Sequence, residues 1–207
     1  MDLVNIPKTK RGRETLNNIC NSAKILFSEN GYFNTGIVDI AQKSGVAQGT
    51  VYIYFKDKKS IFRYIVKSLD TELRKAINDA RKTATDRYTE EYLGIKTFLE
   101  FVDQNVGIFK IIWQAQFVDM ELFTDYYDAF STSYIKGIKR AQDAGEIREI
   151  DPQVLSYCFI GISNFIALKY IIFEDRKDYD YIIESVMDFI KDGAFIDKTT
   201  HKRTIVD

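Results

Sequence analysis

The apolar residues follow the periodicity of an α-helix through almost the whole chain, and only two of its 207 residues are proline. Proline interrupts a helix because it has no amide hydrogen and clashes with the preceding turn, so long helices can run through this sequence. In residues 13–30 and 57–82, apolar side chains recur every three or four positions, as they do on one face of an α-helix. We therefore expect an all-α fold without strands or internal repeats.

The same periodicity predicts about nine helices. Gly31 and Gly145 follow two of them as natural stops, and Asp151–Pro152 supplies an N-cap with a proline at the first helical position. The final residues, 196–207, are expected to form a flexible tail. The predicted helices span residues 13–30, 35–45, 48–55, 57–82, 88–104, 106–117, 119–144, 152–174 and 178–194.

Two of these helices, 35–45 and 48–55, are short and are separated by a tight turn with the sequence "GVA". A short helix, a glycine-containing turn and a second short helix form a helix-turn-helix. Val51 and Phe55, four positions apart, are expected to anchor the second helix in the core. In this motif the second helix enters the major groove of DNA, and its first residues contact base edges.

The residue types of the segment "QGTVYIYFKDKKS" (48–60) suit DNA contact better than they suit a helix interior. Gly49 lets the backbone approach DNA closely, while Gln48 and Thr50 can hydrogen-bond to bases or phosphates. The two tyrosines of this segment, Tyr52 and Tyr54, have hydroxyl groups able to reach phosphate oxygens.

Lys58 and Lys59 stand at the start of the long helix, where the helix dipole disfavours cations. A phosphate bound by helix amides and lysine together would account for them; a solvated lysine run is the alternative. Residues 1–60 hold nine Lys/Arg and five Asp/Glu, whereas residues 61–207 hold twenty and twenty-five. A basic head on an acidic body favours contact between the head and a polyanion; a chance distribution of charge is the alternative. The arm "KTKRGR" (8–13) either reaches DNA or is a disordered leader.

The segment "LFSENGYFNTGIVDIAQKSGVAQGTVYIYFKDKKSIF" (26–62) resembles the N-terminal signature of tetracycline-repressor-like (TetR) transcriptional regulators. The resemblance covers about residues 13–62, and the rest of the chain agrees in length and helix arrangement. Gly36, Ile53 and Tyr54 depart from the usual pattern and leave the sequence preference open. By resemblance, the DNA-contacting positions are Thr35, Gln48, Gly49, Thr50, Tyr52, Tyr54 and Lys58.

The resemblance implies a helix-turn-helix domain with its arm over residues 1–56 and a helical effector-binding and dimerisation domain over 57–195. It also implies a cytoplasmic, ligand-responsive regulator, a repressor, that binds a palindromic DNA operator as a homodimer. A small hydrophobic effector would release the operator. The alternative is a helical protein that binds a hydrophobic ligand or partner and has no DNA-binding activity.

The second domain is rich in aromatic residues, most of which a helical core would need in any case. A few polar side chains among them favour a mostly apolar cavity with oriented polar groups, as a hydrophobic effector requires. The candidate effector-binding residues are Trp113, Gln116, Phe117, Tyr134 and Asn164.

The last two predicted helices are expected to form the dimer interface. Residues 152–174 are apolar nearly all round, which a helix exposed on the surface is not, and 178–194 carry a broad apolar stripe. Pairing with the same helices of a second chain would make a two-fold four-helix bundle. The candidate interface residues are Gly161, Phe165, Ile183, Val186, Met187 and Ile190.

No catalytic or metal-binding set stands out. The single histidine, His201, lies in the predicted tail, and the chain has neither a phosphate-binding glycine-rich loop nor a closely spaced cysteine pair. We expect no enzyme activity, no metal and no cofactor. Cys20 and Cys158 lie in apolar helical patterns and are expected to be reduced. The most apolar run, "CFIGISNFIAL" (158–168), is too short to span a membrane.

Overall fold

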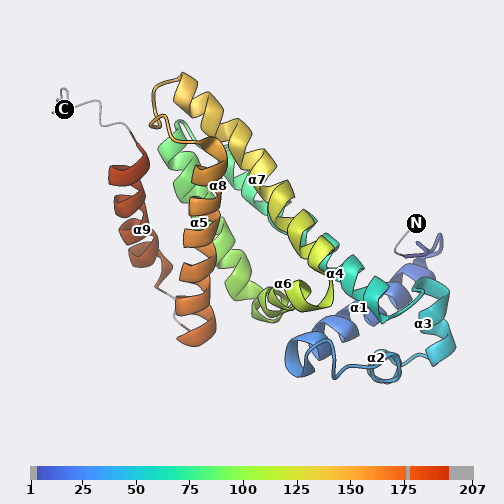
Figure 1. The fold of residues 1–207 in the computed structure, drawn as a ribbon. Helices are drawn as coiled ribbons and strands as arrows, with labels where there is room; N and C mark the ends of the chain where they lie inside the picture. The colour runs from blue at the N-terminus through green and yellow to red at the C-terminus, as the bar shows by residue number, and fades with distance from the viewer. Residues whose placement is uncertain (1–3, 176–177, 196–207) are drawn as a thin grey trace. The chain divides into compact units, whose positions relative to one another are not determined.

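The computed structural model describes residues 4–175 and 178–195, and within these ranges it consists of nine α-helices and one π-helix (Figure 1). The predicted all-α fold is confirmed. The only β-type pairing in the described ranges is an isolated bridge between Ile147 and Phe195. The predicted tail, 196–207, and His201 lie outside the described residues.

The helix bounds follow the predicted periodicity closely, apart from the end of the long apolar segment, where α8 continues as a π-helix, η1. The helices are α1 (Lys10–Asn30), α2 (Ile37–Ser44), α3 (Gln48–Tyr54), α4 (Lys58–Arg81), α5 (Arg87–Gln104), α6 (Val106–Val118), α7 (Met120–Asp143), α8 (Pro152–Ala167), η1 (Leu168–Phe173) and α9 (Tyr179–Ala194).

Local sequence signals explain several helix ends. The Thr9 hydroxyl accepts a hydrogen bond from the Gly12 amide and caps α1, so the helix begins three residues before its predicted start. Most of the "KTKRGR" arm is therefore the first turn of a helix, and the disordered-leader interpretation is wrong for that part. The Asp151 carboxylate accepts from the Gln153 and Val154 amides, which confirms the predicted N-cap of α8.

The chain divides into two compact units. One comprises residues up to Lys75 together with Val102–Tyr127, and the other comprises Ala76–Phe101 together with the residues from Asp128 onward. The long helices α4 and α7 contribute to both units. In the first unit, α1 packs on α2 and on α6, and α2 packs on α3. A single apolar core fills it, with its largest fully buried side chains on α1, at the end of α3 and on α4; they include Phe27, Phe55, Phe62 and Ile65.

The second unit has an apolar core of its own, to which α5, α7, α8 and α9 contribute. Its buried side chains include Ile95, Leu99, Ile138, Leu155, Phe159, Ile183 and Met187. Among the described residues, one helical segment, Pro152–Phe173, is long and apolar enough to cross a membrane by length and composition alone. The expectation that no segment reaches that length is therefore wrong. Core helices of soluble proteins meet the same criterion, and 33% of the segment's most apolar stretch is buried within the protein.

Candidate nucleic-acid interface

The turn between α2 and α3 has the geometry of a helix-turn-helix. Gly45 ends α2 in the left-handed conformation, with φ of 70°, which glycine adopts without the steric cost that other residues carry. Ile40 and Ala41 on α2 are buried in the same apolar core as Val51 of α3 and Phe55, the residue that follows α3. This packing fixes which side of α3 faces outward.

The outward side of α3 is centred on a glycine. Successive residues of a helix are rotated by about 100°, so with Val51 pointing into the core, Gly49 and Ile53 lie nearly opposite it. Gln48, Gly49, Tyr52 and Ile53 are all exposed. A side-chain carbon added at Gly49 would meet no atom within 4 Å. Internal packing therefore does not require glycine at this position, and the middle of the outward side is left open.

The N-terminal segment holds the end of α3. The Asn5 backbone amide donates to the Tyr54 carbonyl at 2.9 Å, and the Asn5 side-chain amide donates to the Ile53 carbonyl at 3.2 Å. The last carbonyls of a helix have no partner within the helix, so Asn5 satisfies two of them and fixes the last turn. Sequence reasoning missed Asn5, because it lies 48 and 49 positions before its partners and belongs to no local motif.

Lys58 lies partly inside this domain. Its ammonium group donates to the backbone carbonyls of Tyr32 and Thr35, both at 2.8 Å, and lies 4.2 Å from the centre of the Tyr32 ring. Burial lowers the pKa of Lys58, and the nearby carboxylate of Asp39 partly offsets this effect. The ammonium group thus connects the start of α4 to the turn before α2.

Thr35 also has a structural role. Its side chain is 1% exposed, and its hydroxyl donates to the Gly31 carbonyl at 2.9 Å and to the Leu26 carbonyl at 3.3 Å. The N-cap of α2 is Gly36, whose amide donates to Asp39 at 2.7 Å. The position of Thr35 is therefore a correction to the expected DNA-contacting set, because a side chain enclosed in this way cannot reach DNA without the turn opening.

Comparison with known proteins identifies this region. Residues 19–65 match the sequence model of "Bacterial regulatory proteins, tetR family". This part of the chain matches the tetR family. The matched residues include α2, α3 and the start of α4, so the tetR-family match falls on the elements whose geometry is described above.

Similarity to known proteins extends beyond the matched region. The chain is 23% identical over 200 residues to the "Fatty acid metabolism regulator protein" of Bacillus subtilis, covering 89% of this chain and 97% of that protein. Two solved structures share its fold. The fatty acid degradation regulator FadR of Bacillus halodurans superimposes with a TM-score of 0.77 at 14% identity, over 95% of this chain and 100% of that one. FadR of Bacillus subtilis, solved in complex with stearoyl-CoA, gives 0.75 at 17% identity, over 84% and 97%.

The predicted DNA-contacting residues of this chain fall into two groups. Five of them lie together on α3, where Gln48, Gly49 and Tyr52 are exposed and Thr50 and Tyr54 are partly buried. The other two, Thr35 and Lys58, hydrogen-bond to backbone carbonyls next to α2, as described above. Lys56, between α3 and α4, is exposed and has no hydrogen bond or ion pair with the described residues.

Gln114 of α6 connects that helix to the end of α1. Its side-chain amide donates to the Phe27 carbonyl at 3.0 Å, and its oxygen accepts from the Tyr32 amide at 2.7 Å. Near the start of α6, a side-chain carbon at Gly107 would lie 2.9 Å from the Ser28 side chain, so the two helices are in close contact there. The Gln114 amide group therefore stabilises the turn after α1.

Asp119, the residue before α7, pairs with the start of α4. Its carboxylate lies 3.2 Å from the Lys59 ammonium and 3.0 Å from Arg63 Nε. The carboxylate is nearly buried, whereas about half of the Lys59 side chain is exposed. Lys59 is therefore engaged in an ion pair and is not part of a free lysine run.

The five candidate effector-binding residues are divided between the two units. Trp113, Gln116 and Phe117 lie on α6 in the first unit, with the Trp113 ring 6.0 Å from that of Phe109 and the Gln116 amide donating to the Trp113 carbonyl. Phe117 is exposed. Tyr134 on α7 and Asn164 on α8 belong to the second unit, where the Asn164 amide donates to the Ile160 carbonyl of its own helix.

Tyr134 is part of a buried polar cluster. Its hydroxyl donates to Glu91, which has no exposed surface and also pairs with Arg87 at 2.7 Å. The guanidinium carbons of Arg81 and Arg87 lie 4.9 and 5.5 Å from the centre of the Tyr134 ring. Burial, followed by the Glu91 charge, raises the pKa of Tyr134. The spacing of apolar residues does not predict this cluster. Tyr134, which was expected to line a mostly apolar cavity, is surrounded by charged side chains instead.

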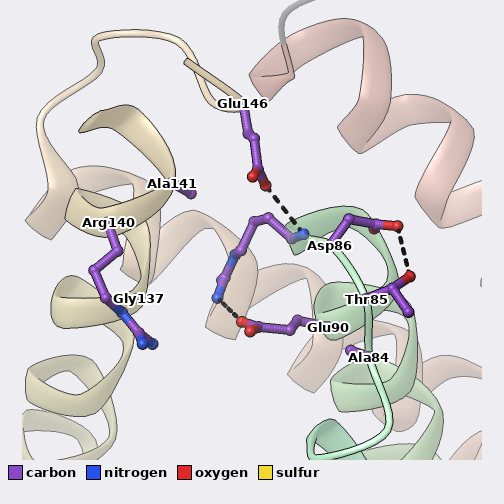
Figure 2. A pocket seen from close by; sticks show the side chains of 9 residues that line it. Ala84, Thr85, Asp86, Glu90, Gly137, Arg140, Ala141 and Glu146 are labelled. Atoms are coloured by element: carbon purple, nitrogen blue, oxygen red, sulfur yellow. Dashed lines mark hydrogen bonds and ion pairs between the residues drawn. The ribbon is translucent and has the colours of Figure 1, made fainter. Parts of the chain in front are cut away.

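A small polar hollow lies beside the cluster (Figure 2). Glu90 pairs with Arg87 at 2.9 Å, and Glu146 accepts a hydrogen bond from the Arg87 backbone amide at 3.1 Å. Charges of both signs line the hollow, so it favours neither an anion nor a cation. Its lining residues are Ala84, Thr85, Asp86, Arg87, Glu90, Gly137, Arg140, Ala141 and Glu146.

The predicted dimer-interface residues are also divided. Four of the six are buried within the single chain on α9: Ile183, Val186, Met187 and Ile190. This corrects the assignment of the α9 apolar stripe, because that stripe completes the core of its own chain. Phe165 is exposed and Gly161 partly exposed on α8.

A different set of apolar side chains is exposed on α8 and α9. Phe165, Tyr181 and Phe189 are 64%, 60% and 72% exposed. They line one open hollow, whose other lining residues are Ile162, Ile166, Tyr170, Ile182, Ser185 and Val186. We call this the α8–α9 aromatic face.

Proposed function

We propose that this chain is a ligand-responsive transcriptional regulator, a repressor, that binds a palindromic operator as a homodimer in the cytoplasm. The observation that carries the proposal is the outward side of α3. There Gln48 and Tyr52 flank a glycine that internal packing does not require, while Val51 is fully buried. A recognition helix with an open middle can approach the bases of the major groove closely.

Four polar residues of α3 have a proposed part in binding. Gln48 and Thr50 supply hydrogen bonds to base edges, and Tyr52 and Tyr54 supply hydroxyls for phosphate oxygens. Lys56 is the proposed phosphate contact in place of the enclosed Lys58 ammonium group. The DNA-binding domain would comprise residues 1–56 and the effector-binding and dimerisation domain 57–195.

The α8–α9 aromatic face supports the proposed homodimer. Large exposed apolar patches mark interaction sites, and Phe165, Tyr181 and Phe189 lie around one hollow on this face. A second copy of the chain would cover them by two-fold pairing. Two recognition helices are then available for two half-sites, about one turn of DNA apart.

The proposed effector is a small molecule with a long acyl chain. Two of the similar proteins are a fatty acid metabolism regulator and a FadR solved with stearoyl-CoA. The site is proposed near Trp113, Gln116 and Phe117 on α6, and Trp113 as the single tryptophan would report binding by fluorescence. By linkage, an effector that weakens operator binding must itself be weakened by operator to the same extent.

The test measures binding to DNA duplexes taken from the region upstream of the gene that encodes this chain and from a random pool. We expect the wild-type chain to select a palindromic sequence. Gly49→Leu should weaken that binding at least tenfold without loss of stability, because a side-chain carbon added at Gly49 meets no atom within 4 Å, whereas the leucine would block the approach to DNA. Gly193→Leu is the matched control, since a side-chain carbon there also meets nothing within 4 Å.

Failure of the wild-type chain to bind any duplex would contradict the proposal and favour the alternative, a helical ligand-binding or partner-binding protein. Equal binding by Gly49→Leu and wild type would show that α3 does not lie at the DNA.

A further inference from the structure

We propose that Ile53 contacts the C5 methyl group of a thymine in each operator half-site and so sets part of the base preference. The inference rests on the proposed operator binding. It concerns a residue that offers no hydrogen bond, and to which the sequence pattern assigned no role.

The position of Ile53 is the first part of the argument. Ile53 is 61% exposed and follows Gly49 by four residues, so the two lie one turn apart on the outward side of α3. Val51 lies on the opposite side of the helix and has no exposed surface. Gly49 presents no side chain, so Ile53 is the bulkiest group at the centre of this side.

The backbone at Ile53 is held by its surroundings. The side-chain amide of Asn5 donates to the Ile53 carbonyl, and the backbone amide of Asn5 donates to the carbonyl of Tyr54. Phe55, immediately after α3, is 1% exposed and anchors the end of the helix in the core. A β-branched side chain also has few rotamers in a helix. The isoleucine is therefore presented to a ligand with little loss of freedom on binding.

The chemistry of the major groove then selects the contact. Every base pair offers hydrogen-bonding groups in this groove, and the C5 methyl of thymine is its one apolar group. An isoleucine placed against the amino group of cytosine would remove that donor from water without a partner, at a cost in free energy. Against thymine, the same side chain buries a methyl group.

Exposure alone does not carry this inference, since isolated apolar side chains on a protein surface are common. Ile25 on α1 is an example, being 42% exposed on a helix outside the helix-turn-helix. Ile53 differs because it lies at the centre of the outward side of α3, opposite the buried Val51. Ile25 therefore serves as the matched control.

The experiment replaces thymine by deoxyuridine, which removes only the C5 methyl group and keeps the base pairing. The duplex is the palindrome selected by the wild-type chain, with one thymine position replaced at a time, in one half-site or in both. For the thymine opposite Ile53 we expect about fourfold weaker binding per half-site and about fifteenfold when both are replaced, from the free energy of burying one methylene-sized group.

Ile53→Ser should remove the sensitivity at that position, and only there, whereas Ile25→Ser should keep it. Circular dichroism and binding to a non-specific duplex show that each variant is folded and still meets DNA. Ile53→Val, which shortens the side chain by one methyl, should retain part of the sensitivity. These results together would show that Ile53 and the thymine methyl are coupled.

Two outcomes overturn the proposal while leaving operator binding intact. One is that no thymine of the operator is sensitive to the replacement. The other is that the sensitive thymine stays equally sensitive in Ile53→Ser. Absence of sequence-specific binding by the wild-type chain would instead contradict the proposed function itself, so the two failures are distinguishable.

Discussion

The helix-turn-helix and the α8–α9 pair differ in how their apolar residues are used. In the helix-turn-helix, Val51 and Phe55 are buried as predicted, and Gln48 and Tyr52, which are proposed to contact DNA, are exposed on α3. On α9, the apolar stripe predicted as a dimer interface is buried in the same chain, while Tyr181 and Phe189 are exposed. Periodicity thus identifies which residues avoid water but does not say which surface covers them.

The two units also differ in how many charged side chains they bury. The core formed by α1, α2, α3 and α4 is apolar, whereas the second unit buries Arg87 and Glu91 next to Tyr134. A core of the first kind follows from the spacing of apolar residues. A buried charge cluster depends on which helices meet, so it has no signature in the spacing.

The largest expected difference in stability is between substitutions on the buried and the exposed side of α9. Ile183→Glu places a charge at a position with no exposed surface, and an unpaired buried charge costs several kcal/mol. We expect this variant to unfold or aggregate. Phe189→Glu changes a side chain that is mostly exposed, so stability should change by less than about 0.5 kcal/mol while the dimer dissociates. Urea unfolding and sedimentation velocity measure the two effects; a folded, dimeric Ile183→Glu would refute the intrachain role of the stripe.

The buried cluster gives the next largest effect. Glu91→Leu leaves the buried guanidinium of Arg87 with less compensation and Tyr134 without its acceptor, and breaking a buried pair in this way costs about 3–5 kcal/mol. Glu90→Gln is the control, because Glu90 pairs with the same arginine but is one-third exposed, and should cost less than about 1 kcal/mol. Chemical unfolding followed by circular dichroism compares the two. Equal losses would show that Glu91 is not the buried partner.

The smallest effects separate a structural lysine from a DNA-contacting one. Lys58→Met removes two hydrogen bonds to backbone carbonyls and should destabilise the protein by about 1–2 kcal/mol, without changing the salt dependence of DNA binding. Lys56→Met should leave stability unchanged and lower the slope of log K against log salt by about one for each phosphate that is no longer neutralised. If Lys58→Met instead lowered the salt slope and left stability unchanged, Lys58 would have to leave the carbonyls of Tyr32 and Thr35 and bind phosphate.

The two native cysteines help to interpret these variants. Burial raises the pKa of the Cys20 thiol to about 12, so at pH 8 it remains protonated and unreactive. Cys158 is exposed on α8. Alkylation with a fluorescent reagent therefore marks α8 selectively, and protection of Cys158 that disappears in Phe189→Glu would locate the dimer contact on that helix.

Much of the architecture was determined by the sequence itself. Apolar spacing, the scarcity of proline and a few caps predicted nine helices and most of their bounds, because these signals act within one or two turns of the chain. The helix-turn-helix was predictable for the same reason, since Gly45, Val51 and Phe55 lie within eleven positions of one another.

Tertiary structure decided which of the predicted residues are available to a partner. Thr35 and Lys58 donate hydrogen bonds to backbone carbonyls, and Tyr134 donates one to Glu91. Asn5 holds the end of α3 through hydrogen bonds to residues 48 and 49 positions away. Hydrogen-bonding groups are satisfied by whichever partner packing brings within about 3 Å, and the order of residues along the chain does not specify that partner.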